Sequence, residues 1–304
     1  MMKKIIHKPN FFIVGAAKCG TTALSYYLAS HPNIFFSPVK EPHYFATDMK
    51  YRTVRRFNDY IKLFENANPN LHYAIGEGST TYLFSKVAIE NIITFSSAAK
   101  IIVMIRNPVD MVVSLYFQRL GEDGFENLRS FEEAWEAEKK RKLGKNIPFT
   151  CPDPQLLFYS EWGKLGSQLQ RVFNYVPRDQ ILVIIFDDFI NDTRSVYCNV
   201  LSFLNLQDDG RTTFPPRRER RMVRNFFYHR LLAFLTRLWM PARSILTRGR
   251  GFGLYERYFY WNSRLIKPTI SSGVKRELTS FYKNEIQLLE EILHRDLSNW
   301  LSVS

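Results

Sequence analysis

Cysteine is scarce in this sequence. Only three residues of this type, Cys19, Cys151 and Cys198, occur among 304 positions. An odd number of cysteines at wide spacing provides neither a disulfide framework nor the clustered pattern of a zinc site. The chain is therefore expected to work in a reducing compartment.

Long apolar runs are also lacking. No stretch approaches the roughly 20 apolar residues that span a bilayer. The first apolar run, Phe11 to Val14, is too short for the apolar region of a signal peptide and is typical of a buried strand. We therefore expect a cytoplasmic protein, with peripheral contact to a membrane left open.

The chain has no internal repeat and no linker rich in proline or serine. With 45% hydrophobic residues it can bury a large core, and single α/β domains reach this length. We expect one domain over residues 1–304, with an insertion at about 207–265.

Charge is abundant and unevenly placed. The formal net charge is +13, and the segment from Arg211 to Arg250 holds eleven arginines against one acid, Glu219. This segment suits an anionic partner such as a nucleotide, a charged glycan or a membrane surface. No recognised nucleic-acid module accompanies it, so nucleic acid is not an expected partner.

Short apolar runs alternate with segments of helical spacing. The expected strands are 11–14, 34–36, 72–75, 100–105 and 181–186, and the expected helices are 23–30, 86–95, 108–116, 130–143, 154–175, one that ends at Leu204, and 274–293. This alternation predicts an α/β fold with a mostly parallel sheet and helices on both faces.

Three loops with polar residues follow the predicted strand ends at Val14, Ile75 and Ile105. In parallel sheets, ligands bind at the carboxyl ends of the strands. The strand pattern alone therefore brings these three loops together as a candidate site.

The first of these loops joins a strand to a helix. Its small residues allow the backbone to approach an anion, and the amide groups at the helix start can hold it. The lysine lies inside the loop, whereas an ATPase loop places it directly after the second glycine. The candidate anion-binding residues are Ala17, Lys18, Cys19, Gly20, Thr21 and Thr22.

The double threonine after Gly20 resembles the K-x-G-T-T loop of sulfotransferases that use 3′-phosphoadenosine 5′-phosphosulfate (PAPS), above all the heparan sulfate sulfotransferases. Residues 37–45 resemble their K-E-P-H-F/Y-F segment. Residues 76–82 resemble their E-x-S/T-x-x-Y segment, and 101–118 resemble their 3′-phosphate motif.

Two later segments extend the match. Residues 186–206 resemble the strand–acidic–helix segment of bacterial sulfotransferases, and 288–300 resemble their closing L-x-x-L-L-x-R-D-L-x-x-W helix. The motifs occur in the family's order, which makes the resemblance specific. It implies a P-loop-like fold and PAPS as co-substrate, leaving 3′-phosphoadenosine 5′-phosphate (PAP), without a metal ion.

The resemblance also implies roles for single residues. Glu77 would be the catalytic base that takes a proton from a hydroxyl or amine acceptor. Lys18 and Lys40 would neutralise charge on the transferring group, as metal ions do in phosphoryl transfer. Arg106 and Ser114 would hold the 3′-phosphate, which distinguishes PAPS from ATP.

Each residue also has an ordinary structural interpretation. Glu77 can be a salt-bridge acid, Lys40 a solvated loop lysine and Arg106 a turn residue. Cys19 can fill the loop or have a lowered thiol pKa at the helix start.

Histidine is the rival base, as in the sulfotransferases of small molecules. His31 precedes a proline at a helix end and is expected to be structural. His72 lies at the beginning of the strand that leads to Glu77, too far back to act. His43, beside Lys40, is the histidine expected to contact the acceptor.

The arginine-rich insertion does not match the family. Arg250 and Gly251, within Arg248 to Gly251, are the expected loop that closes over the nucleotide. Residues 226–240 fit an amphipathic helix on an anionic membrane and a buried helix about equally well.

Two other functions remain open. One is a P-loop kinase, which the position of the lysine disfavours and which would need magnesium. The other is a non-catalytic protein that binds an anionic glycan or lipid through its arginines. For a sulfotransferase, the motifs favour an acceptor on a carbohydrate or glycolipid. This expectation is an analogy with the family, because acceptor sites vary among proteins of one fold.

Overall fold

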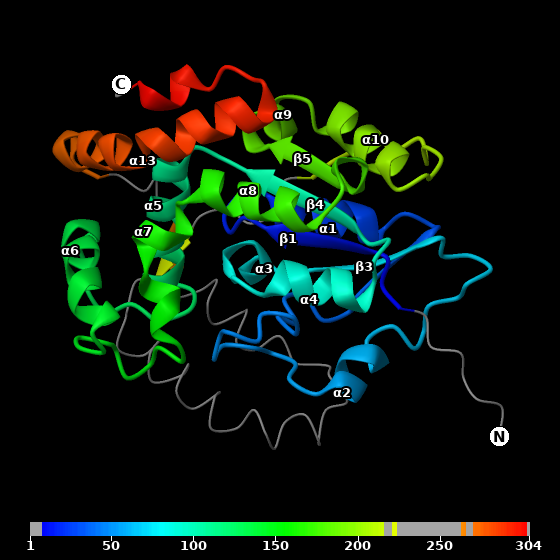
Figure 1. Ribbon diagram of the computed structural model, residues 1–304, viewed down its shortest axis with the longest axis horizontal. Helices are drawn as coiled ribbons and strands as arrows, with labels where there is room; N and C mark the ends of the chain where they lie inside the picture. The colour runs from blue at the N-terminus through cyan, green and yellow to red at the C-terminus, as the bar shows by residue number, and fades with distance from the viewer. Residues whose placement is uncertain (1–7, 216–220, 224–262, 266–269, 303–304) are drawn as a thin grey trace. The chain divides into compact units, whose positions relative to one another are not determined.

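The computed structural model describes residues 8–215, 221–223, 263–265 and 270–302 (Figure 1). The chain forms two compact units. The first comprises Met1–Met111, Trp162–Arg218 and Leu278–Ser304, and the second comprises Val112–Glu161 and Glu219–Glu277. The expected single domain with an insertion stays a prediction.

A five-stranded sheet forms the centre of the first unit (Figure 1). All pairs are parallel, and the strand order is β2-β3-β1-β4-β5. The strands are β1 (Phe11–Gly15), β2 (Ile34–Phe36), β3 (Ala74–Gly78), β4 (Lys100–Ile105) and β5 (Ile181–Ile185). The apolar runs therefore predict the existence and order of all five strands, because strands covered on both faces need apolar side chains in both directions.

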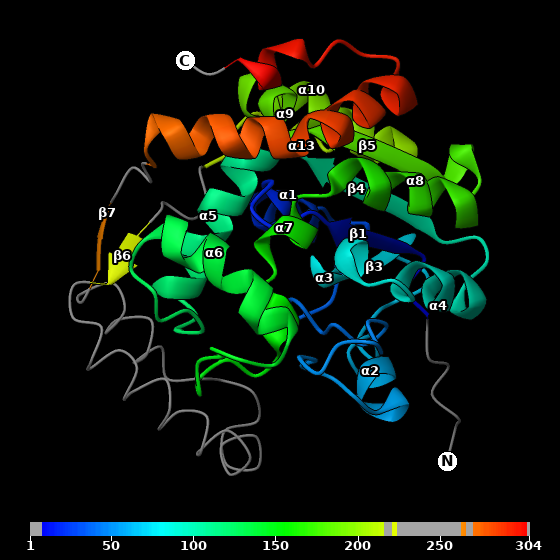
Figure 2. The ribbon, with the colours of Figure 1, turned by 60° about the vertical axis from the view of Figure 1, so that its left-hand side comes forward.

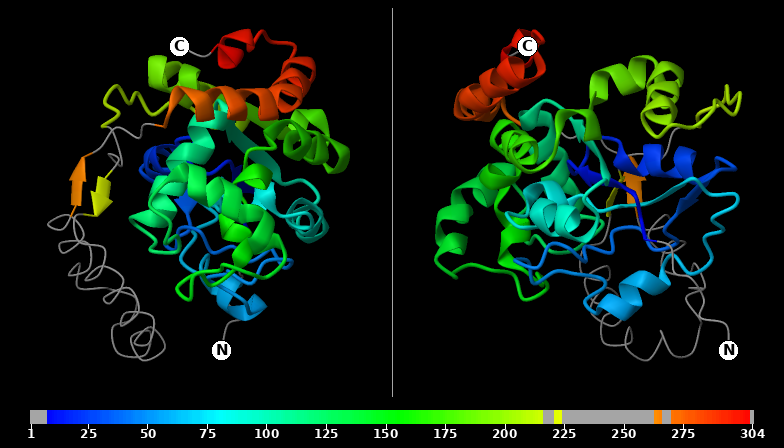
Figure 3. Two further views of the ribbon diagram at one scale, coloured as in Figure 1. Left: turned by 90° about the vertical axis from the view of Figure 1, so that its left-hand side faces the viewer. Right: turned by 45° about the vertical axis from the view of Figure 1, so that its right-hand side comes forward.

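Helices cover both faces of this sheet (Figure 3). On one face lie α1 (Thr21–Ala29) and α10 (Thr193–Phe203), preceded by the short helix α9 (Phe186–Asn191). The ring of Phe214 joins these helices, 5.1 Å from the ring of Tyr27 in α1 and 5.3 Å from that of Tyr197 in α10.

The other face is covered by α3 (Thr81–Phe84), α4 (Ala88–Phe95), α8 (Leu165–Tyr175) and α13 (Ser272–Leu293), and α2 (Phe57–Lys62) precedes β3 along the chain. Gly163 allows α13 to pack closely, since a Cβ atom there would lie 2.3 Å from the ring of Tyr282. The prediction of a doubly covered parallel sheet is confirmed.

The described residues of the second unit are mainly helical (Figure 2). The unit contains most of α5 (Pro108–Leu120), α6 (Phe131–Lys142), the turn η1 (Pro154–Leu157) and α7 (Tyr159–Trp162), with the antiparallel pair β6 (Arg221–Val223) and β7 (Ser263–Leu265). Ser130 caps α6 by accepting from the N–H of Glu133. Arg141 and Glu126 form a fully buried ion pair with N–O distances of 2.7 Å.

Several expected elements have different bounds; the helix expected for 108–116, for example, continues to Leu120. The helix predicted for 154–175 consists of η1, α7 and α8, because the chain leaves helical geometry around Phe158 and again at Gly163. The third strand does not stop before Gly76 but continues through Gly78. Glu77 therefore belongs to the sheet and is not part of the loop that follows it.

Candidate active site

The loop between β1 and α1 has the backbone geometry of an anion site. Lys18 and Gly20 have positive φ angles of 63° and 88°, and Gly20 is the N-cap of α1. Such a turn directs successive amide groups to one side, at the positive end of the helix. A Cβ atom at Gly20 would meet the rings of Phe186 and Phe189 at 3.2 Å, so the close packing of α9 also favours glycine there.

Cys19 fills the interior of this loop. Its side chain is fully buried, and Sγ lies 3.4 Å from the carbonyl oxygen of Ala17. Burial raises the pKa of the Cys19 thiol to about 12, although Arg106 and Lys18 act in the opposite direction. The space-filling interpretation of Cys19 is thus favoured over a reactive thiolate, because only the thiolate is nucleophilic.

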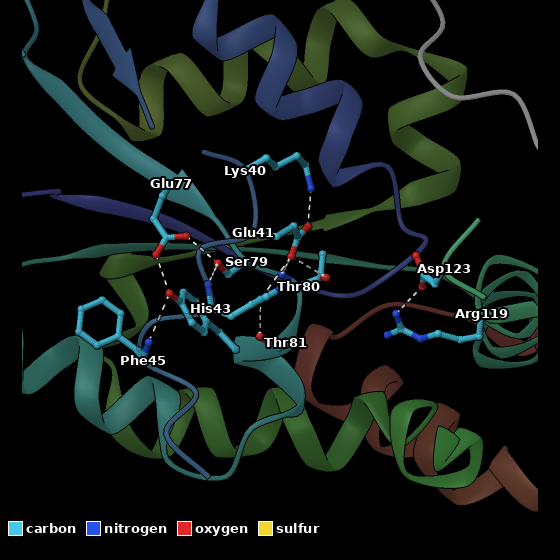
Figure 4. Close-up of polar contacts among 11 residues, drawn as sticks. Lys40, Glu41, His43, Phe45, Glu77, Ser79, Thr80, Thr81, Arg119 and Asp123 are labelled. Carbon is cyan, nitrogen blue, oxygen red and sulfur yellow. Dashed lines mark hydrogen bonds and ion pairs between the residues drawn. The ribbon is translucent and has the colours of Figure 1, made fainter. Parts of the chain in front are cut away.

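A carboxylate cluster lies beside this loop (Figure 4). Glu41 accepts from the backbone N–H of Thr80 at 2.7 Å and from its hydroxyl at 3.1 Å. The N–H of Glu41 bonds the carbonyl of Gly78 at 3.0 Å, which fixes the segment at the end of β3. A Cβ atom at Gly15 would lie 3.2 Å from the carbonyl oxygen of Thr80, so the cluster borders the start of the loop between β1 and α1, residues 15–22, called the phosphate loop below.

Lys40 and His43 complete the cluster. Lys40 Nζ is ion-paired with one oxygen of Glu41, and His43 Nδ1 lies 3.6 Å from the other. His43 is buried, and its Nδ1 shares a hydrogen bond of 2.8 Å with the hydroxyl of Thr81. Burial acts to raise the pKa of the Glu41 carboxyl, but Lys40 and His43 outweigh it, and the pKa lies below its ordinary value.

Glu77 has a different environment. Its side chain is fully buried, and its oxygens accept from three hydroxyls: Tyr82 at 2.7 Å, Ser79 at 2.8 Å and Tyr60 at 3.2 Å. Burial raises the pKa of Glu77 to about 7, and the three hydroxyl donors only partly oppose it. The residue is thus a buried, hydrogen-bonded carboxyl within β3.

Arg106 follows β4, on the other side of β1 from β3. Its guanidinium stacks on the ring of Phe186 at 4.7 Å, and Nη2 lies 3.3 Å from Asp110. Ser114 lies buried in α5, the helix that begins two residues after Arg106. The strand order therefore places Arg106 and the Glu41 cluster on opposite sides of the phosphate loop.

The two other histidines considered as bases have structural contacts. His31 is buried, with Nε2 3.1 Å from the carbonyl oxygen of Gln207, and its Nδ1 accepts from the N–H of Asn33 at 3.1 Å. Nδ1 of His72 accepts from the N–H of Asn68 at 2.8 Å, and the residue precedes β3. The contacts of His31 agree with the structural interpretation expected for it, and His72 lies before β3, away from the strand end.

The expected closing loop at Arg250 and Gly251 and the amphipathic segment 226–240 lie outside the described residues. Sequence reasoning assigned no role to Glu41 and Thr80, the pair that the structure places beside the phosphate loop. The available signal was the K-E-P-H-Y-F segment itself, in which Glu41 directly follows Lys40.

No helix within the described ranges is long and apolar enough to cross a membrane. A membrane-associated sulfotransferase of Dictyostelium discoideum is 26% identical over 70% of this chain and 59% of its own length. Carbohydrate sulfotransferase 15 of Mus musculus is 28% identical over 65% of this chain and 44% of its own length. The chain thus spans about half the length of these curated relatives.

A crystal structure of a sulfotransferase from Alicyclobacillus acidocaldarius matches the fold with a TM-score of 0.71 and 26% identity, covering 98% of this chain and all of the other. The family model described as the sulfotransferase domain matches residues 8–226, which include the phosphate loop, the Glu41 cluster and Arg106. The chain belongs to the sulfotransferase domain family.

Proposed function

We propose that this protein transfers a sulfuryl group from PAPS to a hydroxyl or amine of a carbohydrate or glycolipid by in-line displacement. One observation carries the proposal. The carboxyl ends of three adjacent parallel strands, β3, β1 and β4, are bordered in turn by the Lys40–Glu41 ion pair, which Thr80 holds after β3, by a loop with the geometry of an anion site and by Arg106. In this order, a phosphosulfate held on the middle loop would have a proton acceptor on one side and cations on both sides.

The donor would lie on the loop between β1 and α1. Its amide groups and Lys18 would hold the 5′-phosphosulfate and stabilise the charge that develops on the leaving phosphate. Arg106 and Ser114 would hold the 3′-phosphate. Because AMP has no 3′-phosphate, it would lack these charge-assisted hydrogen bonds, and the two residues would select PAP over AMP.

Access decides which carboxylate is the better base. A general base has to come within hydrogen-bond reach of the proton that it removes. The Glu77 side chain has no exposed surface and three hydroxyl donors, whereas the Glu41 side chain is 24% exposed beside the phosphate loop. We therefore assign the base to Glu41, and Glu77 to a supporting role through Ser79, whose oxygen accepts from the N–H of His43.

Lys40 would act on both reactants. Its ammonium group is paired with Glu41 and is 29% exposed. Interaction with the sulfuryl oxygens of a bound donor would compete with this ion pair and release Glu41 for the acceptor. His43, in contact with Glu41 and Thr81, would limit the orientation of the carboxylate on its buried side.

The test is calorimetric titration with PAP and with AMP, in the presence of a chelator. We expect PAP to bind more tightly than AMP, and Arg106→Ala to lower PAP affinity by roughly tenfold to a hundredfold, the range for a hydrogen bond to a charged group. The affinity for AMP should hardly change.

Arg178→Ala is the matched control. Arg178 also stacks its guanidinium on a phenylalanine ring, that of Phe173 at 4.4 Å, but it precedes β5 at the amino end of the sheet. Equal affinities for PAP and AMP in the unmodified protein would refute the proposal, and magnesium-dependent binding of ATP would favour a kinase.

A further inference from the structure

The closing segment of the chain, residues 288–300, has no role in the reaction proposed above. Helix α13 ends at Leu293, and the chain then turns back to the short helix η3 (Ser298–Leu301). Glu290 holds this turn by accepting from the N–H of Leu297 at 2.8 Å. Trp300 lies within η3 and is only 3% exposed.

Trp300 connects the ends of two neighbouring strands. Its indole Nε1–H donates to Oδ2 of Asp187, at the start of α9, with a distance of 3.2 Å. Its backbone carbonyl accepts from Nδ2 of Asn107, which follows β4, also at 3.2 Å. Arg295 pairs with both oxygens of Asp188, so two points fix the closing segment to α9.

Both partners of Trp300 are chain neighbours of residues that contact the candidate donor site. Asn107 follows Arg106 directly, and its Oδ1 accepts from the N–H of Val109 at 2.9 Å at the start of α5. Asp187 follows Phe186, whose ring supports the guanidinium of Arg106. The same ring borders Gly20 of the phosphate loop.

We infer that Trp300 positions Arg106 for the 3′-phosphate, through Asn107 on one side and through Asp187 and Phe186 on the other. The inference rests on the proposed function, because it assumes that Arg106 holds the 3′-phosphate. It makes the closing segment of the chain part of the donor site, although Trp300 itself touches no reacting atom.

Without the indole N–H of Trp300, the carboxylate of Asp187 loses this donor and the segment is held less firmly against α9. Trp300→Phe retains an aromatic ring and removes this one bond. We expect PAP affinity to fall about fivefold, the size of one hydrogen bond's net contribution, while AMP affinity stays unchanged. The ratio of the two affinities, measured by calorimetry, separates positioning of Arg106 from a general loss of structure.

Asn107→Ser tests the other connection. Serine keeps an oxygen that can cap α5 but is too short to bond the carbonyl of Trp300. We expect a similar loss of the PAP preference. The double variant should lose less than the product of the two single losses, because both changes release the same turn.

Trp135→Phe is the matched control, since Trp135 Nε1 donates to Glu277, a carboxylate on neither β4 nor α9, at the same distance of 3.2 Å. If the unmodified protein prefers PAP and both Trp300→Phe and Asn107→Ser keep that preference, the inference is wrong and the proposed function stands. A parallel loss for PAP and AMP would make the role of Trp300 purely structural. No preference in the unmodified protein would overturn the proposed function and this inference together.

Discussion

Replacing Glu41 with glutamine is expected to lower turnover by about a thousandfold, within the range that general-base catalysis contributes. Glutamine keeps the size of the side chain and one oxygen for the N–H and hydroxyl of Thr80. It cannot accept a proton from the acceptor. The measurement is transfer of radiolabelled sulfate from PAPS to desulfated heparin, with both substrates saturating.

Glu77→Gln is the companion variant, and it should keep turnover within about threefold of the unmodified protein. The protonated carboxyl and the amide offer the same two groups to the three surrounding hydroxyls, so the packing of β3 is maintained. Binding of PAP should be unchanged in both variants, because neither carboxylate is assigned to the nucleotide. Nucleotide binding thus shows that each variant is folded.

The pair of variants distinguishes the two carboxylates. A large loss in Glu77→Gln with normal turnover in Glu41→Gln would return the base to Glu77, the choice favoured by the sequence motif. Large losses in both would mean that the buried carboxyl and the partly exposed one act as a unit. In that case their effects on turnover would not multiply in the double variant.

The fold could be predicted from the sequence because its strands are covered on both faces. The run from Ile101 to Ile105 is continuously apolar and forms β4 as expected. The error at β3 has a clear cause. Its last residues, Gly76 to Gly78, look like a turn, but they pair with Phe11, Phe12 and Ile13 of β1 and extend the sheet.

The site was only partly predictable. The phosphate loop and Arg106 have local signals, a strand end followed by a helix start. The exposure of Glu77 and Glu41 has no such signal. It depends on Tyr60 and Tyr82, which close over Glu77 from α2 and α3, and on Thr80, which holds Glu41 at the edge of the loop. The contacts of Tyr60 with Glu77 and of Thr80 with Glu41 join residues that are 17 and 39 positions apart in the sequence.

The buried carboxyl of Glu77 should make the free energy of unfolding depend on pH. The pKa of its carboxyl is about 7 in the folded protein and is expected near 4.5 in the unfolded chain. Between these values the folded state binds more protons, so the free energy of unfolding falls as pH rises. A difference of this size corresponds to roughly 3 kcal/mol, which is fully lost only above pH 7.

Glu77→Gln should remove this dependence, because the amide does not ionise. In urea unfolding between pH 5 and pH 8.5, we expect the variant to gain about 3 kcal/mol relative to the unmodified protein as pH rises. Glu90→Gln, which changes an exposed glutamate of α4, should leave the pH dependence unchanged.

If the free energy of unfolding depends on pH in the same way in Glu77→Gln and in the unmodified protein, the carboxyl of Glu77 has the same pKa in the folded and unfolded states. The hydrogen bonds from the three hydroxyls would then fully offset the effect of burial. Glu77 would then be ionised at neutral pH, as a general base has to be, but it would still be less accessible to the acceptor than Glu41. If the pH dependence of the free energy of unfolding disappears only in Glu77→Gln, the buried carboxyl of Glu77 lowers the stability of the protein when it ionises. Such a cost is expected where a buried group orients a functional segment, here the one held by Ser79 and His43.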